Sequence, residues 1–465
     1  MKLRREILRL ALPSILANIT VPLVGMVDLA VAGHLQGDFS SAAFIGGISV
    51  GSMLFELMYW NFAFLRTGTG GLTAQAYGRG DVPYQAYCLK RALGIALISG
   101  VALIAIQWLV VQGAFLVVKC TPEVRTLASQ YFYIRIYAAP AAISLFAFKG
   151  WFIGMQDSVR PMTADLIVNG VNISMSIVLA LLMGFKGIAL GTVLAQWSGF
   201  TYCCIAISRR YRKIFLSAGV GQNFFDHFQG EKVLVREGEE KFVNKKEVLA
   251  GETPTEKPGH FFRMNRDLVL RSLCMIAVYI GFTVISARHG DLMLASASIL
   301  MKLLMLLSYF CDGFAYAGEA LTGRFIGEGS ADGVRSTIRA CFLWGGGFAL
   351  AFFAIYGLGG VPLLKLFSGD QAVVDAARQF LPWLMLMPLV GAPTFLWDGI
   401  YTGATRTRDM MLSTLFCVIG FFGVYLGGYY FFTGGSDVLA IHVLMAAYFV
   451  HLAIRLAWLT LRWKQ

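Results

Sequence analysis

The stretch ILRLALPSILANITVPLVGMVDLAVAG, residues 7–33, decides what kind of protein this is. It is long enough to cross a membrane as one helix, because about 20 apolar residues at about 1.5 Å of rise each span the hydrocarbon core. Pro13 and Pro22 interrupt it. A proline inside a helix removes a backbone hydrogen bond, so we expect this helix to be kinked or able to bend.

Asp28 is the acid of this stretch. An ionised carboxylate at bilayer depth must face protein or a water-filled cavity, and a functional site is its default interpretation. The alternative is a structural acid that hydrogen-bonds to a neighbouring helix.

The composition of the whole chain is that of an integral membrane protein. Its 465 residues are 57% hydrophobic and only 14% charged, with a mean hydropathy of +0.65. The apolar runs are long and continuous, which favours helices over a β-barrel. We therefore predict an all-α fold of twelve transmembrane helices, over residues 7–34, 43–66, 89–117, 128–153, 162–184, 187–208, 268–288, 293–320, 338–358, 378–403, 411–432 and 438–461.

The net charge of +12 reflects how the chain is oriented in the membrane and does not indicate a nucleic-acid partner. Basic residues gather before the first predicted helix and in every second loop after it. The opposite loops hold few. By the positive-inside rule, this pattern predicts a multi-pass protein of the bacterial inner membrane with both termini in the cytoplasm.

The eight cysteines show no CxxC or metal-type spacing, so we expect neither disulfides nor a metal site.

One long polar stretch, residues 209–266, divides the predicted helices six and six. We interpret it as a cytoplasmic linker between an N-lobe, residues 1–208, and a C-lobe, residues 267–465. Within the linker, residues 232–243 (KVLVREGEEKFV) have the alternation of a small hairpin, although the segment is short.

The two halves repeat each other. LTAQAYGRG, residues 72–80, matches LTGRFIGEG, residues 321–329, at an offset of 249 positions. Gly150 and Gly154 match Gly399 and Gly403 at the same offset. Six helices separate the copies, so the halves keep the same membrane orientation and are related by an axis along the membrane normal. This organisation is typical of secondary transporters that expose a central site to alternate sides.

These residues resemble the MATE (multidrug and toxic compound extrusion) transporters, specifically the DinF branch. FFRMNRDLVLRSLC at 261–274 and SYFCDGFAYAGEALTGRFIGEG at 308–329 are similar to that branch's signatures, and GMQDSVRPM and GATRTRDM resemble the family's cytoplasmic turn motif. The resemblance implies two six-helix lobes in a V, exporting organic cations and amphipathic compounds in exchange for H+ or Na+.

The resemblance also assigns residues. Asp28 matches the acid of the N-lobe cation site, and Pro13 matches the proline at which the first helix bends. Asn172 and Thr192 match the family's asparagine and threonine, but Ser176 stands where the family has a second acid. Na+ prefers several oxygen ligands with negative charge nearby, so the loss of one carboxylate favours H+ as the coupling ion.

Three further acids lie within predicted helices. Asp312 and Glu319 are two helical turns apart and share one face, so they could form a C-lobe proton or cation site. Asp398 is a similar candidate. The alternative is that Glu319 pairs with Arg324 and that Asp312 pairs with a neighbouring helix.

Soft and aromatic side chains are candidates for lining a promiscuous cavity, and the alternative for each is a core or lipid-facing position. These candidates are Met53, Tyr59, Trp60, Met301 and Met305. For Glu56, Arg66, Arg135 and Lys302 we expect ion pairing or snorkelling.

We therefore predict a proton-coupled multidrug exporter that is monomeric, needs no cofactor beyond the coupling ion and is not an enzyme. Its partners would be amphipathic or cationic small molecules and the lipid bilayer. The nearest alternative is a flippase of lipid-linked or polyprenyl substrates, which would need Arg and Lys in its cavity. A membrane-embedded enzyme is a second alternative, but the chain has no HExxH and no Gly-rich nucleotide loop. A channel is a third.

Overall fold

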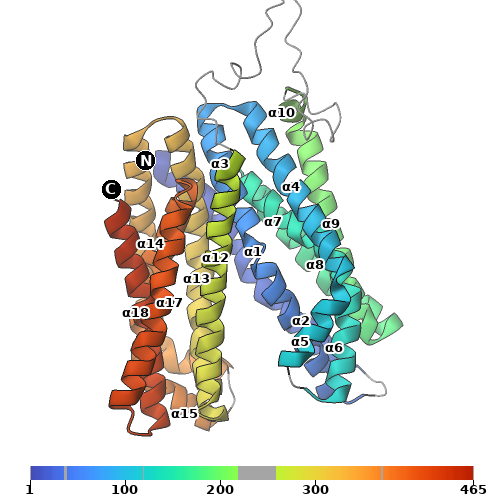
Figure 1. The fold of residues 1–465 in the computed structure, drawn as a ribbon, viewed down its shortest axis with the longest axis vertical. Helices are drawn as coiled ribbons and strands as arrows, with labels where there is room; N and C mark the ends of the chain where they lie inside the picture. The colour runs from blue at the N-terminus through green and yellow to red at the C-terminus, as the bar shows by residue number, and fades with distance from the viewer. Residues whose placement is uncertain (1, 36–38, 119, 218–257, 368–369, 464–465) are drawn as a thin grey trace, which may run out of the picture.

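The computed structural model of the chain describes residues 2–35, 39–118, 120–217, 258–367 and 370–463. Figure 1 shows two helical bundles side by side. The first half of the chain forms α1 (Lys2–Gly33), α2 (Ser41–Trp60), α3 (Ala63–Arg79), α4 (Val82–Ala105), α5 (Gln107–Val117), α6 (Pro122–Arg135), the 3-10 turn η1 (Ile136–Ala138), α7 (Ala139–Gly154), α8 (Val159–Met183), α9 (Phe185–Arg210) and α10 (Arg212–Ser217). The second half forms α12 (Pro258–Ala287), α13 (Asp291–Gly327), α14 (Ala331–Phe367), α15 (Gln371–Gln379), α16 (Leu381–Gly403), α17 (Thr407–Phe432) and α18 (Asp437–Trp463).

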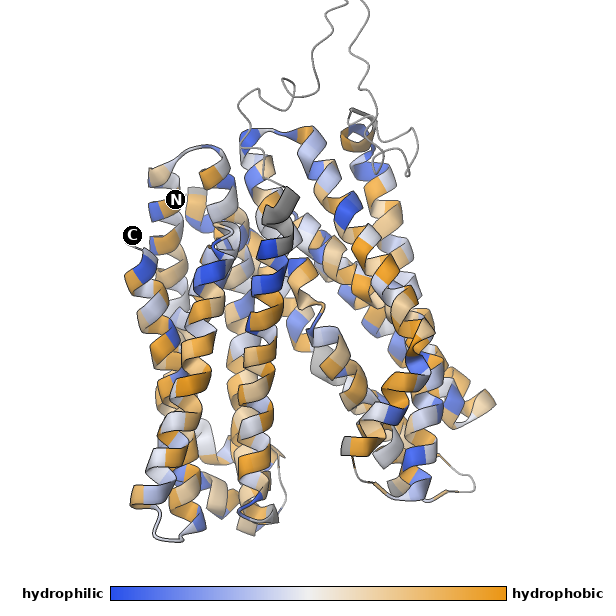
Figure 2. Ribbon diagram, viewed as in Figure 1, coloured by the Kyte–Doolittle hydropathy of each residue, from blue (hydrophilic) through white to orange (hydrophobic). Residues whose placement is uncertain are grey.

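Within the described ranges, twelve helical stretches are long and apolar enough to cross a membrane. This confirms the all-α, twelve-helix prediction, and Figure 2 shows apolar residues along most of each span. Some boundaries differ. The second span is α2 and α3 in succession, and α13 and α14 run well past their predicted ends. Residues 258–266, which we expected in the linker, are helical and begin α12. The predicted hairpin at 232–243 lies outside the described residues.

The break between α2 and α3 has a local cause. Asn61 follows the last residue of α2, and its side-chain amide donates to the carbonyl of Leu57 at 2.7 Å. An asparagine that satisfies a helix's last carbonyls competes with continuation of the helix. The chain turns once and then resumes as α3, so the predicted cavity residues Tyr59 and Trp60 lie at this joint.

The internal repeat is visible in the backbone. Among the described residues, two that are not glycine are left-handed, Gln156 (φ 61°) and Thr405 (φ 54°), and they lie 249 positions apart. So do Gly80 (φ 70°) and Gly329 (φ 71°), which follow α3 and α13. Such conformations are uncommon outside glycine, so their recurrence at one offset shows that the two halves share the same turns.

The repeated glycines also bring the two lobes together. A Cβ on Gly78 of α3 would collide with the carbonyl of Arg324 on α13, and a Cβ on Gly327 of α13 would collide with the carbonyl of Gln75 on α3. Gln75 and Arg324 are themselves equivalent positions of the repeat. Only glycine allows backbones to approach this closely. The lobes therefore meet where α3 and α13 cross, at the end of the molecule that carries both termini (Figure 1).

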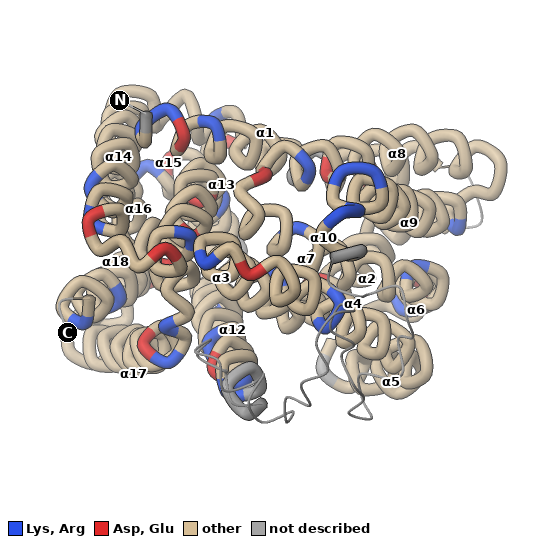
Figure 3. The backbone as a smooth tube through the Cα atoms, turned by 90° about the horizontal axis from the view of Figure 1, so that it is seen from above, with Lys and Arg blue, Asp and Glu red and all other residues tan. Residues whose placement is uncertain are grey.

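The first helix belongs to both lobes. Its beginning, including Leu10 and Ile15, is buried in one core with Phe314 and Leu321 of α13. Its other end, at Ala32, is buried in a separate core with residues of α2, α6 and α9. Viewed onto the end where the lobes meet, α1 and α3 lie between the bundle of α12–α18 and that of α4–α9 (Figure 3). A movement of α1 would therefore change the packing in both bundles.

Candidate functional site

Asp28 of α1 lies in a buried polar cluster with residues of α8 and α9. Its side chain and those of Asn172, Ser176 and Thr192 are nearly inaccessible, Asp28 being 6% exposed. Asn172 and Ser176 are one turn apart on α8. Gly191 packs directly against the backbone of Ser176, which draws α9 close to α8. As a result, the Asn172 amide donates to the Thr192 hydroxyl at 3.0 Å.

Several oxygens of this cluster have no hydrogen-bond partner among the described residues. They are one carboxylate oxygen of Asp28, the amide oxygen of Asn172 and the hydroxyl of Ser176. The Ser176 hydroxyl is near enough to act on the Asp28 carboxylate, but not in the geometry of a full hydrogen bond. A buried polar atom without a partner is costly and calls for an explanation. Carboxylate, amide and hydroxyl oxygens are groups that can bind a proton or a small cation.

Arg135 of α6 is the cation that acts on Asp28 from a distance. Its guanidinium donates to the hydroxyls of Ser52 at 3.1 Å and Tyr131 at 3.0 Å, and it lies over the ring of Phe55. These contacts satisfy Arg135 without an ion pair. Asp28 consequently feels a positive field while its carboxylate stays unpaired within the described residues.

Pro13 lies inside α1, which the structure shows as one uninterrupted helix from Lys2 to Gly33. The proline lies about three turns from the start of α1, in the half that packs on the C-lobe core, between Leu10 and Ile15. Its role as a hinge stays a prediction.

Glu319 of α13 forms an ion pair with Arg66 of α3, at 3.1 Å across the lobe interface. The Glu319 side chain is 1% exposed, and Gly70 makes room for it, since a Cβ there would collide with the carboxylate. The alternative that Glu319 pairs with Arg324 is wrong, because Arg324 pairs with Glu6 and Glu328 at 2.8 Å each. This residue therefore joins the lobes.

Asp398 of α16 is held by two arginines of the C-lobe. Arg271 of α12 approaches one of its oxygens at 3.1 Å, and Arg455 of α18 makes a short contact with the same oxygen. Arg455 is almost fully buried. Neither arginine is among the site residues predicted from the sequence. The available signal was that both lie within spans, where a basic residue needs a partner.

Asp312 is partly buried on α13 and takes part in no ion pair within the described residues. Arg66, Arg271 and Arg455 are the cations near it, and Asp398 is the neighbouring acid. The structure thus separates the three C-lobe candidates: Glu319 and Asp398 are ion-paired, whereas Asp312 is not.

The predicted cavity residues fall in different places. Met53 is exposed, and Trp60 packs edge-on against Tyr279 of the other lobe with ring centroids 5.5 Å apart. Tyr59 has a buried hydroxyl without a partner among the described residues. Met301 lines an apolar pocket in the C-lobe, whereas Met305 does not.

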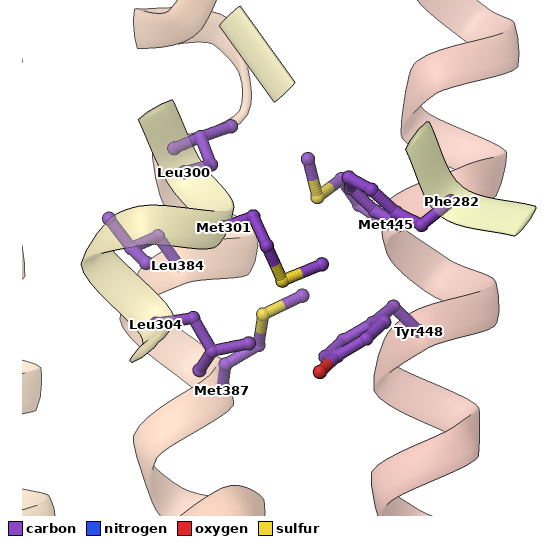
Figure 4. Close-up of a pocket in the computed structure, with 8 residues that line it drawn as sticks. All are labelled: Phe282, Leu300, Met301, Leu304, Leu384, Met387, Met445 and Tyr448. Carbon is purple, nitrogen blue, oxygen red and sulfur yellow. The ribbon is translucent and has the colours of Figure 1, made fainter. Parts of the chain in front are cut away.

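This methionine pocket lies among α12, α13, α16 and α18 and has about 10 Å³ of free volume, room for about one water molecule. Figure 4 shows the thioethers of Met301, Met387 and Met445 directed toward one another, with the Tyr448 ring beside them. Flexible, polarizable side chains of this kind adapt to ligands of varied shape. The remaining lining residues are Phe282, Leu300, Leu304 and Leu384.

Comparisons with known proteins agree with this architecture. The MatE family model matches residues 13–203 and 268–426. DNA damage-inducible protein F of Escherichia coli K12 is 32% identical over 89% of this chain and 83% of its own length. A probable multidrug resistance protein NorM of Thermotoga maritima is 22% identical over 90% of this chain and 83% of its own length.

A solved structure of a MATE transporter has the same fold. A mutant of VcmN, a MATE transporter of Vibrio cholerae, superposes with a TM-score of 0.79 at 13% identity, covering 100% of this chain and 98% of that one. Family model, relatives and fold therefore lead to one conclusion: the chain belongs to the MATE family, as a multi-pass membrane transporter and not an enzyme.

Proposed function

We propose that this protein is a secondary active exporter that moves cationic and amphipathic compounds outward in exchange for protons. The observation that carries the proposal is the unpaired, buried carboxylate of Asp28 among neutral oxygens. A carboxylate in such a place can gain or lose a proton without first breaking an ion pair. The similarity to a probable multidrug resistance protein, NorM of Thermotoga maritima, supports the substrate class.

The choice of ion rests on Ser176. With a serine at this position, the cluster of Asp28, Asn172, Ser176 and Thr192 contains a single carboxylate. A sodium ion would need several oxygens and compensating negative charge. A proton needs only the carboxylate oxygen.

The coupling step follows from the packing of α1. Protonation removes the charge of Asp28 near one end of the helix, whereas the other end is buried in the C-lobe core. A bend near Pro13 would then change how the N-lobe half of α1 packs against α8, and this change would release the drug. We place both termini, which lie at one end of the molecule, on the cytoplasmic face of a bacterial inner membrane because the basic loops lie on that side.

The test is transport of a fluorescent cationic dye in proteoliposomes under a pH gradient or a sodium gradient imposed separately. We expect the pH gradient alone to drive uptake. Asp28→Asn should reduce that uptake to the level of empty liposomes, because an amide cannot carry the proton. Asp332→Asn, which changes an exposed acid at the start of α14, is the matched control and should transport normally.

Two results would contradict the proposal. Normal pH-driven transport by Asp28→Asn would remove the coupling role of Asp28, and sodium-driven uptake by the wild type would make the choice of ion wrong. Absence of dye movement under either gradient would favour the flippase alternative.

A gain-of-function change tests the role of Ser176. Ser176→Asp places a second carboxylate one turn from Asn172, so we expect sodium-driven dye uptake to appear. Ser176→Asn replaces the hydroxyl with an uncharged amide and should not produce sodium-driven uptake. A Ser176→Asp protein that stays insensitive to sodium gradients would show that the missing acid does not determine the ion.

A further inference from the structure

Arg66 of α3 rests on the face of α13 that carries two acids. Asp312, Tyr316 and Glu319 share this face, because residues three, four and seven positions apart lie on one side of a helix. The guanidinium of Arg66 lies over the ring of Tyr316, 4.5 Å from its centroid. One acid thus lies a turn before, and the other a turn after, the ring on which Arg66 rests.

The two acids are used unequally in this structure. Glu319 forms the ion pair with Arg66, at 3.1 Å. Asp312 forms no ion pair within the described residues, although Arg66 is the strongest of the cations that act on it. Arg66 also donates to the hydroxyl of Thr67 at 3.2 Å, which is a neutral partner. One arginine is therefore under the influence of two carboxylates and bonds to one of them.

The internal repeat does not balance this arrangement. At the offset of 249, neither acid has an acidic counterpart on α3, and Arg66 has no basic counterpart on α13. The pairs of equivalent positions are Ala63 and Asp312, Arg66 and Ala315, and Gly70 and Glu319. Gly70 leaves the room that the Glu319 carboxylate occupies. Two acids on one side of a pseudo-symmetric crossing thus face one arginine on the other side.

The two acids differ in their distance from the place where the lobes meet. α3 and α13 cross with Gly78 packed on Arg324. Along α13, Glu319 lies about one and a half turns from Arg324, and Asp312 lies about three turns from it. A rocking motion that opens this end displaces Glu319 from α3 more than it displaces Asp312. Because a buried guanidinium without a counter-ion is costly, Asp312 is the acid that can replace Glu319.

We propose that Arg66 is a switch between two acids. It pairs with Glu319 while the lobes meet at the end that carries both termini, and it pairs with Asp312 once the lobes separate there. The guanidinium turns over the Tyr316 ring and keeps a carboxylate partner in both states. Glu319 is then a positioning residue for the closed arrangement, and Asp312 is one for the open arrangement. The switch goes beyond proton exchange at Asp28, because it concerns the movement of the lobes whatever ion or compound is carried.

Cys88 of α4 can report the separation of the lobes. Its side chain is only 6% exposed. It is buried in one cluster with Leu72 of α3 and with Met264 and Leu268 of α12. Since α3 and α4 belong to one lobe and α12 to the other, this thiol becomes accessible to a maleimide when the lobes move apart.

The test is the rate at which N-ethylmaleimide modifies Cys88 of the full chain in phosphatidylcholine nanodiscs, followed by mass spectrometry of its peptide. We expect Glu319→Gln to raise this rate by about tenfold, the value of one charge-assisted hydrogen bond, and Asp312→Asn to lower it by a similar factor. Asp332→Asn, which changes an exposed acid of α14, is the matched control and should leave the rate unchanged. Cys417 is fully buried, so its continued protection shows that each variant is folded.

The same measurement in an Arg66→Gln background tests whether the arginine is the switch. There, Asp312→Asn should no longer change the Cys88 rate, because Asp312 acts through Arg66. This comparison decides the question even if Glu319→Gln does not fold.

Three results would overturn the proposal. They are a rise in the Cys88 rate in both Glu319→Gln and Asp312→Asn, as expected if the acids serve the fold alone, an unchanged rate in either variant, and an effect of Asp312→Asn that persists without Arg66. The labelling needs no gradient and no transported compound. A failure of proton-driven transport would therefore remove the proposed function and leave this switch in place.

Discussion

Asp28 and Asp398 are acids within membrane-spanning helices, but their surroundings are opposite. Asp28 has no ion pair within the described residues and faces neutral oxygens, whereas Asp398 is shared by Arg271 and Arg455. An acid held by two guanidinium groups serves as their counter-ion, because its removal would leave two buried cations without a counter-charge. The presence of an acid in a span therefore does not by itself identify a coupling site, and among the predicted site acids those without an ion pair within the described residues, Asp28 and Asp312, are the better candidates.

The comparison predicts the largest stability effect at Asp398. Asp398→Asn should lower the free energy of unfolding by about 3–5 kcal/mol, because it leaves Arg271 and Arg455 buried without a carboxylate. Denaturant unfolding in detergent micelles measures this change. The double variant Asp398→Asn with Arg455→Gln should recover part of the loss. A single variant as stable as the wild type would show that the cluster does not contribute to the fold.

Glu319 is the intermediate case, since it has one cationic partner. Glu319→Gln should cost about 1–3 kcal/mol, because Arg66 loses its counter-ion but keeps its bond to Thr67 and its place over the Tyr316 ring. A double-mutant cycle with Arg66→Gln measures the coupling between the two side chains. Additive effects in that cycle would mean that the ion pair does not hold the lobes together.

The smallest stability effect is expected at Asp28. Asp28→Asn should change the free energy of unfolding by less than about 1 kcal/mol, because it breaks no ion pair, while transport is lost. Asp332→Asn, which removes an exposed pair with Arg335, should leave both stability and transport unchanged. If Asp28→Asn unfolds the protein, Asp28 is a structural acid and the comparison fails.

Much of the fold could be predicted because long apolar runs admit few structures in a membrane. The twelve spans and the offset of 249 came from hydropathy and motif spacing, and the structure repeats that offset in its backbone turns. The end of α13 was missed because its final turns are polar enough to resemble a loop, and the end of α14 was missed because Gly359, Gly360 and Pro362 favour a helix end. The start of α12 at Pro258 was missed for the same reason as the end of α13.

The site was harder to predict because partners depend on packing between distant helices. Nothing in the sequence near Glu319 indicates Arg66, which lies 253 positions away; the nearby Arg324 was the natural but incorrect choice. Arg271 and Arg455 are separated from Asp398 by 127 and 57 positions. The family resemblance assigned Asp28 and its neighbours, but it did not show which acids were already neutralised.

The crossing of α3 and α13 has the form of a twofold dimer interface. Gly78 packs on position 324 and Gly327 packs on position 75, so each half offers the same patch to the other. This is an isologous contact, in which every feature occurs twice. In a dimer of two identical subunits, a mutation at such a contact would alter both copies at once. Joined in one chain, the copies can change separately, and they have done so: glutamine stands at position 75 and arginine at position 324. Fusion thus allowed Gln75 to bond across the lobes to Gly403 while Arg324 took Glu6 as its partner.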